Sequence, residues 1–204
     1  YLGVDVVSRT LSCVPNNTEI CSEIENAPFT QFVKSIRVTK LQILLTAVLG
    51  HNKNTLNLYD HAGSPLPEDD AYGLMLRETK EQWSGLFRYC KPDGVSKGVG
   101  LLFSTEIAKH AQTQESGNFS SLRCVGNGWS SALQSMGHCT TYESSDVVAV
   151  TGQMTRGYSK QEIKNILSKG VLLDASAART LQEDGYSQYL GVDIFEDIER
   201  LNTP

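Results

Sequence analysis

Two glutamates in the stretch CSEIENAPF, residues 21–29, have the residue type and the spacing to take part in hydrolysis. Cleavage of a glycosidic bond needs two carboxylates that flank the bond. Glu23 and Glu25 stand two positions apart, so on a strand they share one face and lie about 6.5–7 Å apart along it. Both would approach a sugar from the same side, which excludes them as each other's acid and nucleophile. Either one can be a nucleophile whose partner comes from another strand; the alternative is a solvated strand edge or a helix-capping carboxylate.

A second group of polar residues follows a predicted strand in NLYDHAG, residues 57–63. Asp60 and His61 come directly after that strand. If the strand belonged to a barrel, the pair would lie on the catalytic face, where the carboxyl ends of the strands meet. A solvated loop pair explains the two residues equally well. The four histidines show no metal-binding spacing such as H-E-x-x-H, so no metal site is predicted.

The stretch GQMTRGYS, residues 152–159, has the glycine spacing of a phosphate-binding loop, G-x-x-x-x-G-K-[ST]. Tyr158 stands where that loop has its lysine, so the β- and γ-phosphates would lose their counter-charge. A strand-to-helix loop is therefore predicted there rather than a nucleotide site. The five cysteines are widely spaced and include no C-x-x-C pair, which favours buried or free thiols over a zinc or redox centre. No cofactor is expected.

The composition is that of an ordinary globular protein. The chain has 204 residues, of which 40% are hydrophobic and 20% are charged, and this length allows one large domain or two small ones. A net charge of −5 argues against nucleic-acid binding as the main task. No apolar run reaches the length of a membrane-spanning helix, so no membrane partner is expected. The compartment, cytoplasmic or periplasmic, stays open.

The first half of the chain predicts strand, helix, strand, helix. A β-prone run leads up to Glu23. Apolar residues at helical spacing then indicate a helix over residues 32–49, which Gly50 ends. Residues 54–60 alternate as in a strand, and a second helix covers about 70–89. The stripe expected to face the core from the first helix comprises Val33, Ile36, Leu41, Leu44, Leu45 and Val48. The similar runs YLGVDVV at 1–7 and YLGVDIF at 189–195 are interpreted as separate turn-and-strand pieces, and residues 11–14 as another β-prone run.

The second half predicts a parallel sheet with helices on both faces. Residues 90–98 are rich in Gly, Pro and charge, as in a linker. Short apolar strands then alternate with helices, which is the pattern of a parallel α/β sheet. The expected strands are 99–104, 139–144, 146–152 and 171–174, and the expected helices are 128–136, 159–170 and 175–184. The second of these helices opens with a capping box, Ser159-x-x-Glu162.

Three segments together resemble a known family. They are TEICSEIENAPFTQFVKS, LNLYDHAGSPLPEDDAYGLML and SKGVLLDASAARTLQEDGYSQYLGV. They resemble the bacterial β-galactosidase-like glycoside hydrolases, which join a (β/α)₈ catalytic barrel to a trimerisation domain. That second domain is flavodoxin-like and related in fold to class I glutamine amidotransferases. The resemblance implies the last βα units of a barrel in residues 1–92 and the trimerisation-like α/β domain in residues 97–204.

The resemblance also implies roles for particular residues. Glu25 matches the nucleophile at the end of the seventh barrel strand, with Glu23 as second choice, and Asn26, Asp60 and His61 would line the sugar site. The substrate would be a carbohydrate, and the assembly a homo-oligomer, a trimer by analogy. The family's acid/base glutamate lies on strand four, before residue 1, so we expect a fragment that is inactive alone. The alternative is a non-catalytic α/β oligomerisation or ligand-binding module.

Overall fold

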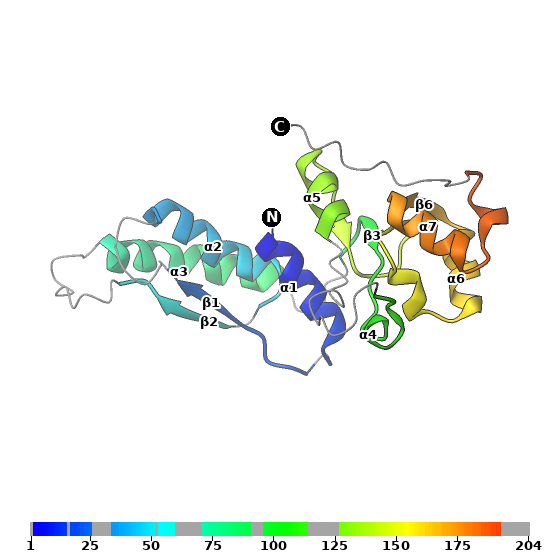
Figure 1. Ribbon diagram of the computed structural model, residues 1–204. Coiled ribbons are helices and arrows are strands. Elements are labelled where there is room, and N and C mark those ends of the chain that lie inside the picture. Colours follow the sequence, from blue (N-terminus) through cyan, green and yellow to red (C-terminus); the bar gives the residue numbers. More distant parts are fainter. Residues whose placement is uncertain are drawn as a thin grey trace, which may run out of the picture. The chain divides into compact units, whose positions relative to one another are not determined.

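The computed structural model describes residues 2–15, 17–25, 34–51, 53–59, 71–90, 96–113 and 127–192. The chain is an α/β protein, and every strand pairing among these residues is parallel (Figure 1). It divides into two compact units, one formed by residues 10–95 and the other by residues 1–9 and 96–204. We call them the two-stranded unit and the four-stranded unit after their sheets.

The chain begins with a helix, α1 (Leu2–Cys13), so the strand predicted for residues 1–7 and the β-prone run at 11–14 are both wrong. β-branched residues in this segment favour a strand, but tertiary contacts at helical spacing prevail. Asp5 is buried and its Oδ1 accepts a hydrogen bond of 2.7 Å from the Tyr142 hydroxyl. One turn later, the Arg9 guanidinium lies 5.2 Å from the centre of the Phe103 ring. Residues 189–192 are not a strand either, since they end the short helix η4 (Ser187–Tyr189) and continue as a turn.

The two-stranded unit consists of two successive βα repeats. Its elements are β1 (Cys21–Glu25), α2 (Ile36–Val48), β2 (Lys53–Asn57) and α3 (Ala71–Tyr89), which confirms the predicted order of strand, helix, strand, helix. The strands pair in parallel, with Glu25 opposite Asn57 at their carboxyl ends. Helix α2 begins later than predicted because Ser35 caps it: the Ser35 side chain accepts a hydrogen bond from the backbone N–H of Val38.

Both helices of this unit cover one face of its sheet (Figure 1). The core consists of Ile24, Ile43, Leu58, Tyr72 and Met75. The core stripe predicted for α2 is wrong in part, because Leu41 and Val48 are exposed while the buried positions are Thr39, Ile43, Thr46 and Ala47. The two threonines are accommodated because their hydroxyls donate to backbone carbonyls of Ser35 and Ile43.

The four-stranded unit contains β3 (Val99–Leu101), β4 (Thr140–Thr141), β5 (Val147–Val150) and β6 (Gly170–Leu173), in the order β4-β3-β5-β6. Helix α5 (Asn127–Ser135) packs on one face, against Leu101 and Ala149. Helices α6 (Lys160–Leu167) and α7 (Ala175–Glu183) pack on the other, against Val148 and Val150 (Figure 1). The predicted parallel sheet with helices on both faces is therefore confirmed.

The connection from β4 to β5 crosses β3 without a helix. Residues 142–146 form it, and they pass over Gly100 on the α6 side of the sheet. A Cβ on Gly100 would lie 3.1 Å from the Ser145 Cβ and 3.4 Å from the carbonyl oxygen of Val147. An open cavity of about 390 Å³ lies beside this crossing, with Leu102, Val148 and Ile166 among its apolar lining. Glycine at position 100 is thus what lets so short a crossover lie flat on the sheet.

We predict that Gly100→Val destabilises the four-stranded unit by about 1–3 kcal/mol, because the added methyl groups must displace the crossing backbone. Gly128→Ala is the matched control, since a Cβ there meets nothing within 4 Å. Urea denaturation followed by Trp129 fluorescence, in a Trp83→Phe background, measures both variants. Equal midpoints for Gly100→Val and the parent would contradict the close crossing.

Candidate functional site

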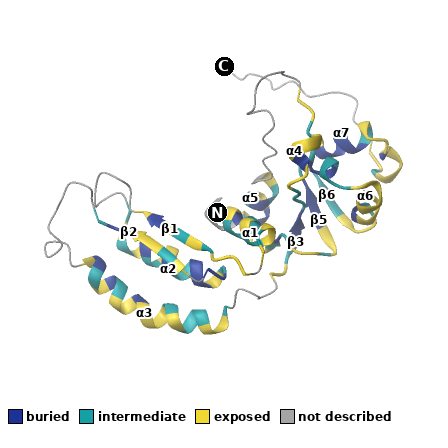
Figure 2. Cartoon of the chain, turned by 90° about the horizontal axis from the view of Figure 1, so that it is seen from below, coloured by how far each residue is buried: buried dark blue, intermediate teal, exposed yellow. Residues whose placement is uncertain are grey.

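One face of the β1–β2 sheet is polar and exposed. Along β1, Ile24 points into the helical core, so its neighbours Glu23 and Glu25 project from the opposite face, where both are exposed. Figure 2 shows both buried and exposed positions along β1. From β2, residues Lys53, Thr55 and Asn57 have the same parity. Cys21 Sγ lies 3.2 Å from Thr55 Oγ1 and joins the two strands, and Lys53 Nζ donates at 2.5 Å to Glu19, which precedes β1. The structure therefore places the two predicted glutamates side by side, on the face opposite the one that α2 and α3 cover.

Glu25 occupies the carboxyl end of β1. Its Oε1 accepts a hydrogen bond of 3.5 Å from Asn57 Nδ2, the residue directly opposite on β2. This long contact joins the two side chains across the strand pair. In parallel α/β folds, catalytic side chains gather at the carboxyl ends of neighbouring strands, and Glu25 with Asn57 has that placement. The alternation in residues 54–60 predicts that Asn57 and its neighbouring leucines point to opposite faces of the strand. Only the strand register shows that Asn57 pairs with Glu25.

Lys34 was not expected in the site. Its ammonium donates to the backbone carbonyl of Glu25 and, at 2.6 Å, to Gln42 Oε1. Burial lowers the pKa of Lys34, and the negative charge of Glu25 opposes that shift. The lysine thus ties the end of β1 to helix α2 and brings a positive charge near the glutamate. No periodicity marks this contact, because Lys34 precedes α2 and no spacing rule pairs it with the end of β1.

The remaining predicted site residues, Asn26, Asp60 and His61, lie outside the described residues. In sequence they follow Glu25 and Tyr59. Their roles stay predictions.

A buried histidine supports β1 from its other face. His51 is 3% exposed and its Nδ1 lies 2.6 Å from Ser22 Oγ, while its Nε2 has no hydrogen-bond partner among the described residues. Burial lowers the pKa of His51. The folded unit therefore holds this ring neutral under conditions in which an exposed histidine takes up a proton.

We predict that the two-stranded unit loses stability as the pH falls below about 6.5, the ordinary pKa of histidine. Above that pH the ring is neutral in both states, so it does not change the balance. Below that pH, His51 takes up a proton in the unfolded chain. In the folded chain it takes up the proton only when the pH falls below its lowered pKa. Urea midpoints read from Trp83 fluorescence in a Trp129→Phe background, at about pH 7.5 and about pH 5.5, measure the loss.

In the same assay, His51→Gln should show a smaller difference between the two pH values than the parent. His138→Gln, at an exposed position, is the control and should keep the full difference. A pH dependence that is unchanged in His51→Gln would show that other groups cause it.

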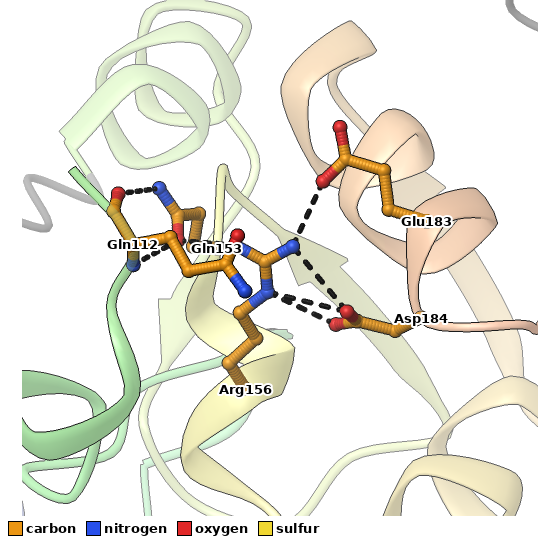
Figure 3. A network of polar contacts seen from close by, with 5 residues as sticks. All are labelled: Gln112, Gln153, Arg156, Glu183 and Asp184. Atoms are coloured by element: carbon orange, nitrogen blue, oxygen red, sulfur yellow. Dashed lines mark hydrogen bonds and ion pairs between the residues drawn. The ribbon is translucent and has the colours of Figure 1, made fainter. Parts of the chain in front are cut away.

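The four-stranded sheet offers a second place for a ligand, at the carboxyl edge between β3 and β5. The strand order reverses there, and open parallel sheets bind ligands at that point. In this chain a network of polar side chains joins the segments that follow these two strands to each other and to the end of α7 (Figure 3). Gln153 donates to the carbonyl of Gln112 and accepts from its N–H, both at 2.8 Å. These bonds fasten the segment that follows α4 (Ile107–His110) to the loop that follows β5.

Arg156 lies at the centre of this network. Its side chain is 8% exposed, and it donates to Glu183 at 2.8 Å, to Asp184 at 3.1 Å and to Gln153 at 2.6 Å (Figure 3). Burial by itself would lower the pKa of Arg156, but the hydrogen bonds and charges of Asp184 and Glu183 raise it overall. Two carboxylates satisfy this cation, so it does not present a free charge to an anion.

The backbone of GQMTRGYS is also occupied. The N–H of Gly152 donates to the Asp174 carboxylate at 3.1 Å, and the same carboxylate caps α7 by accepting from the N–H of Ala177 at 2.7 Å. The N–H groups of Met154, Arg156 and Tyr158 donate to carbonyls within the loop and η3 (Met154–Gly157). A phosphate would need these donors. The loop is thus a structural connection, as its missing lysine indicates.

We predict that Arg156→Met destabilises the four-stranded unit by about 1–3 kcal/mol, because it leaves Glu183 and Asp184 facing each other without their cation. Lys109→Met is the control, since it breaks an exposed ion pair with Glu106 and should give no measurable change. Thermal unfolding with Trp129 as the reporter compares the two. Equal effects would mean that burial of the Arg156 network adds nothing.

Comparisons with known proteins give no relative: no protein-family model matches the chain, and no curated protein and no solved structure matches it. Among the described residues, none of the helices is long and apolar enough to span a membrane. In the same part of the chain, no cluster of three or more His, Cys, Asp or Glu side chains could hold a metal ion.

Proposed function

We propose that this chain carries the nucleophile of a retaining, β-galactosidase-like glycoside hydrolase, and that Glu25 is that nucleophile. The observation that carries the proposal is the placement of Glu25 at the carboxyl end of a parallel strand, on the face opposite α2 and α3, with its carboxylate in contact with Asn57 at 3.5 Å. The resemblance of the segment around Glu25 to the family's nucleophile strand supports it. Two βα repeats side by side are also the unit from which a (β/α)₈ barrel is built.

In the proposed reaction, Glu25 attacks the anomeric carbon and forms a covalent glycosyl-enzyme, which water then hydrolyses. The acid that protonates the leaving oxygen must stand on the other side of the bond. Glu23 cannot fill that role, because it projects from the same face of the same strand. The acid therefore comes from another strand, as the resemblance implies. Asn57 orients the nucleophile, and Asn26, Asp60 and His61 would contact the sugar.

The four-stranded unit has no chemistry in this proposal. The Arg156 network links the segments that follow its strands to one another, which favours a structural role such as supporting an assembly. That observation also favours the second candidate, in which the whole chain is a non-catalytic α/β module.

Chemical rescue tests Glu25. In a protein that joins this chain to the acid/base strand, Glu25→Ala should lower hydrolysis of a nitrophenyl β-galactoside roughly a thousandfold or more. Azide, a small nucleophile that fits the vacated space, should restore turnover and give a galactosyl azide of inverted anomeric configuration. Glu23→Ala is the matched control and should keep most of the activity without azide.

Residues 1–204 by themselves should not turn over the same galactoside, because the single nucleophile lacks its acid. Turnover by residues 1–204 that Glu25→Gln abolishes would show that both groups lie within this chain. If azide restores turnover to the Glu23→Ala variant of the longer protein and not to its Glu25→Ala variant, Glu23 is the nucleophile. An active protein that neither substitution affects would overturn the proposal and favour the non-catalytic module.

A further inference from the structure

Helix α2 is apolar on both sides. Its inner side buries Ile43 and Ala47 against the core of the two-stranded unit. Its outer side carries Val38, Leu41 and Val48, which are 46%, 55% and 52% exposed, together with half-buried Leu45. A surface helix of a globular protein normally has polar residues opposite its core stripe, and a helix that is apolar all round is normally covered on both faces. Among the described residues of the two-stranded unit, nothing covers the outer side of α2, which leaves it as a contact surface.

The spacing of this outer stripe is that of a helix-pairing seam. Val38, Leu41, Leu45 and Val48 follow one another at steps of three, four and three residues, the a and d positions of two heptads. They form one continuous line along the helix. A single partner helix can cover this line from end to end.

We propose that the outer stripe of α2 is an interface between two copies of this chain, in which the two α2 helices pack antiparallel. The stripe is self-complementary in that orientation. Val38 of one copy packs against Val48 of the other, and Leu41 packs against Leu45, so one two-fold axis relates every layer. Such an isologous contact closes as a dimer and needs no second surface.

The charges on α2 select the antiparallel orientation. Arg37 and Lys40 lie in the first half of the helix, the last turn has no basic residue, and the helix contains no acidic residue. A parallel pair would gather the Arg37 and Lys40 side chains of both helices at the same end of the pair, with no acidic residue on either helix to offset them. In the antiparallel pair, each Arg37 lies next to the carboxyl end of the partner helix, where the helix dipole favours a positive charge. The interface is short beside a standard interface of roughly 1,600 Å², so we expect reversible association at roughly tens to hundreds of micromolar.

Sedimentation velocity of residues 1–204 between about 5 and about 500 µM tests the interface. The parent should shift from monomer to dimer over this range. Leu41→Glu should remain monomeric, because it places a carboxylate in the central layer, while its folding is checked by circular dichroism. Leu74→Glu is the matched control, since Leu74 is an exposed leucine on α3, outside the stripe, and should leave the dimer intact.

Cross-linking then tests the orientation in a background whose five native cysteines are replaced by serine. A mixture of Leu41→Cys and Leu45→Cys should form the mixed disulfide in preference to either homodimer. Preferred homodimers would show a parallel pair and overturn the orientation. A parent that stays monomeric to the highest concentration, associates as a trimer, or associates equally well as Leu41→Glu would overturn the interface itself.

Discussion

The burial of Ile24 is the contact on which the candidate site depends. A strand alternates its side chains between two faces, so fixing one residue in a core fixes its two neighbours on the opposite side. The helices α2 and α3 hold Ile24 in their core, and Glu23 and Glu25 must then point away from them. The parallel register with β2 adds Asn57 beside Glu25, and Lys34 ties down the backbone at the same point. Asn57 thus lies directly opposite the anchored strand, and Lys34 contacts its last residue.

The two units use their carboxyl edges in opposite ways. In the two-stranded unit Glu25 is exposed at the edge, and Asn57 contacts one of its carboxylate oxygens. In the four-stranded unit the corresponding edge is closed. Gln153 and Arg156 bind neighbouring segments to one another, and Gly157 packs so closely on Ser104 that a Cβ on the glycine would lie 2.9 Å from the serine side chain. The exposed polar edge of the two-stranded unit is therefore the better candidate for a catalytic site.

Sequence patterns predicted the elements that periodicity controls. The order of strands and helices, the parallel second sheet and the shared face of Glu23 and Glu25 all follow from spacing alone. Helix α1 did not follow, because its β-branched residues favour a strand and only the contacts of Asp5 and Arg9 with distant aromatic rings decide the matter. The core side of α2 did not follow either, since a helix that is apolar on both sides gives periodicity no preferred face. Lys34 and the Arg156 network join residues through loops and across elements, and no spacing rule describes such contacts.

Asp174 shows how tightly the closed edge of the second sheet is built. One carboxylate holds the N–H of Gly152, after β5, and the N–H of Ala177, at the start of α7. The turn after one strand and the first turn of the helix after its neighbour thus share a single acceptor. The contribution of the α7 cap to stability is therefore coupled to the contribution of the turn at Gly152. Substitutions on the two segments will not add independently while Asp174 joins them.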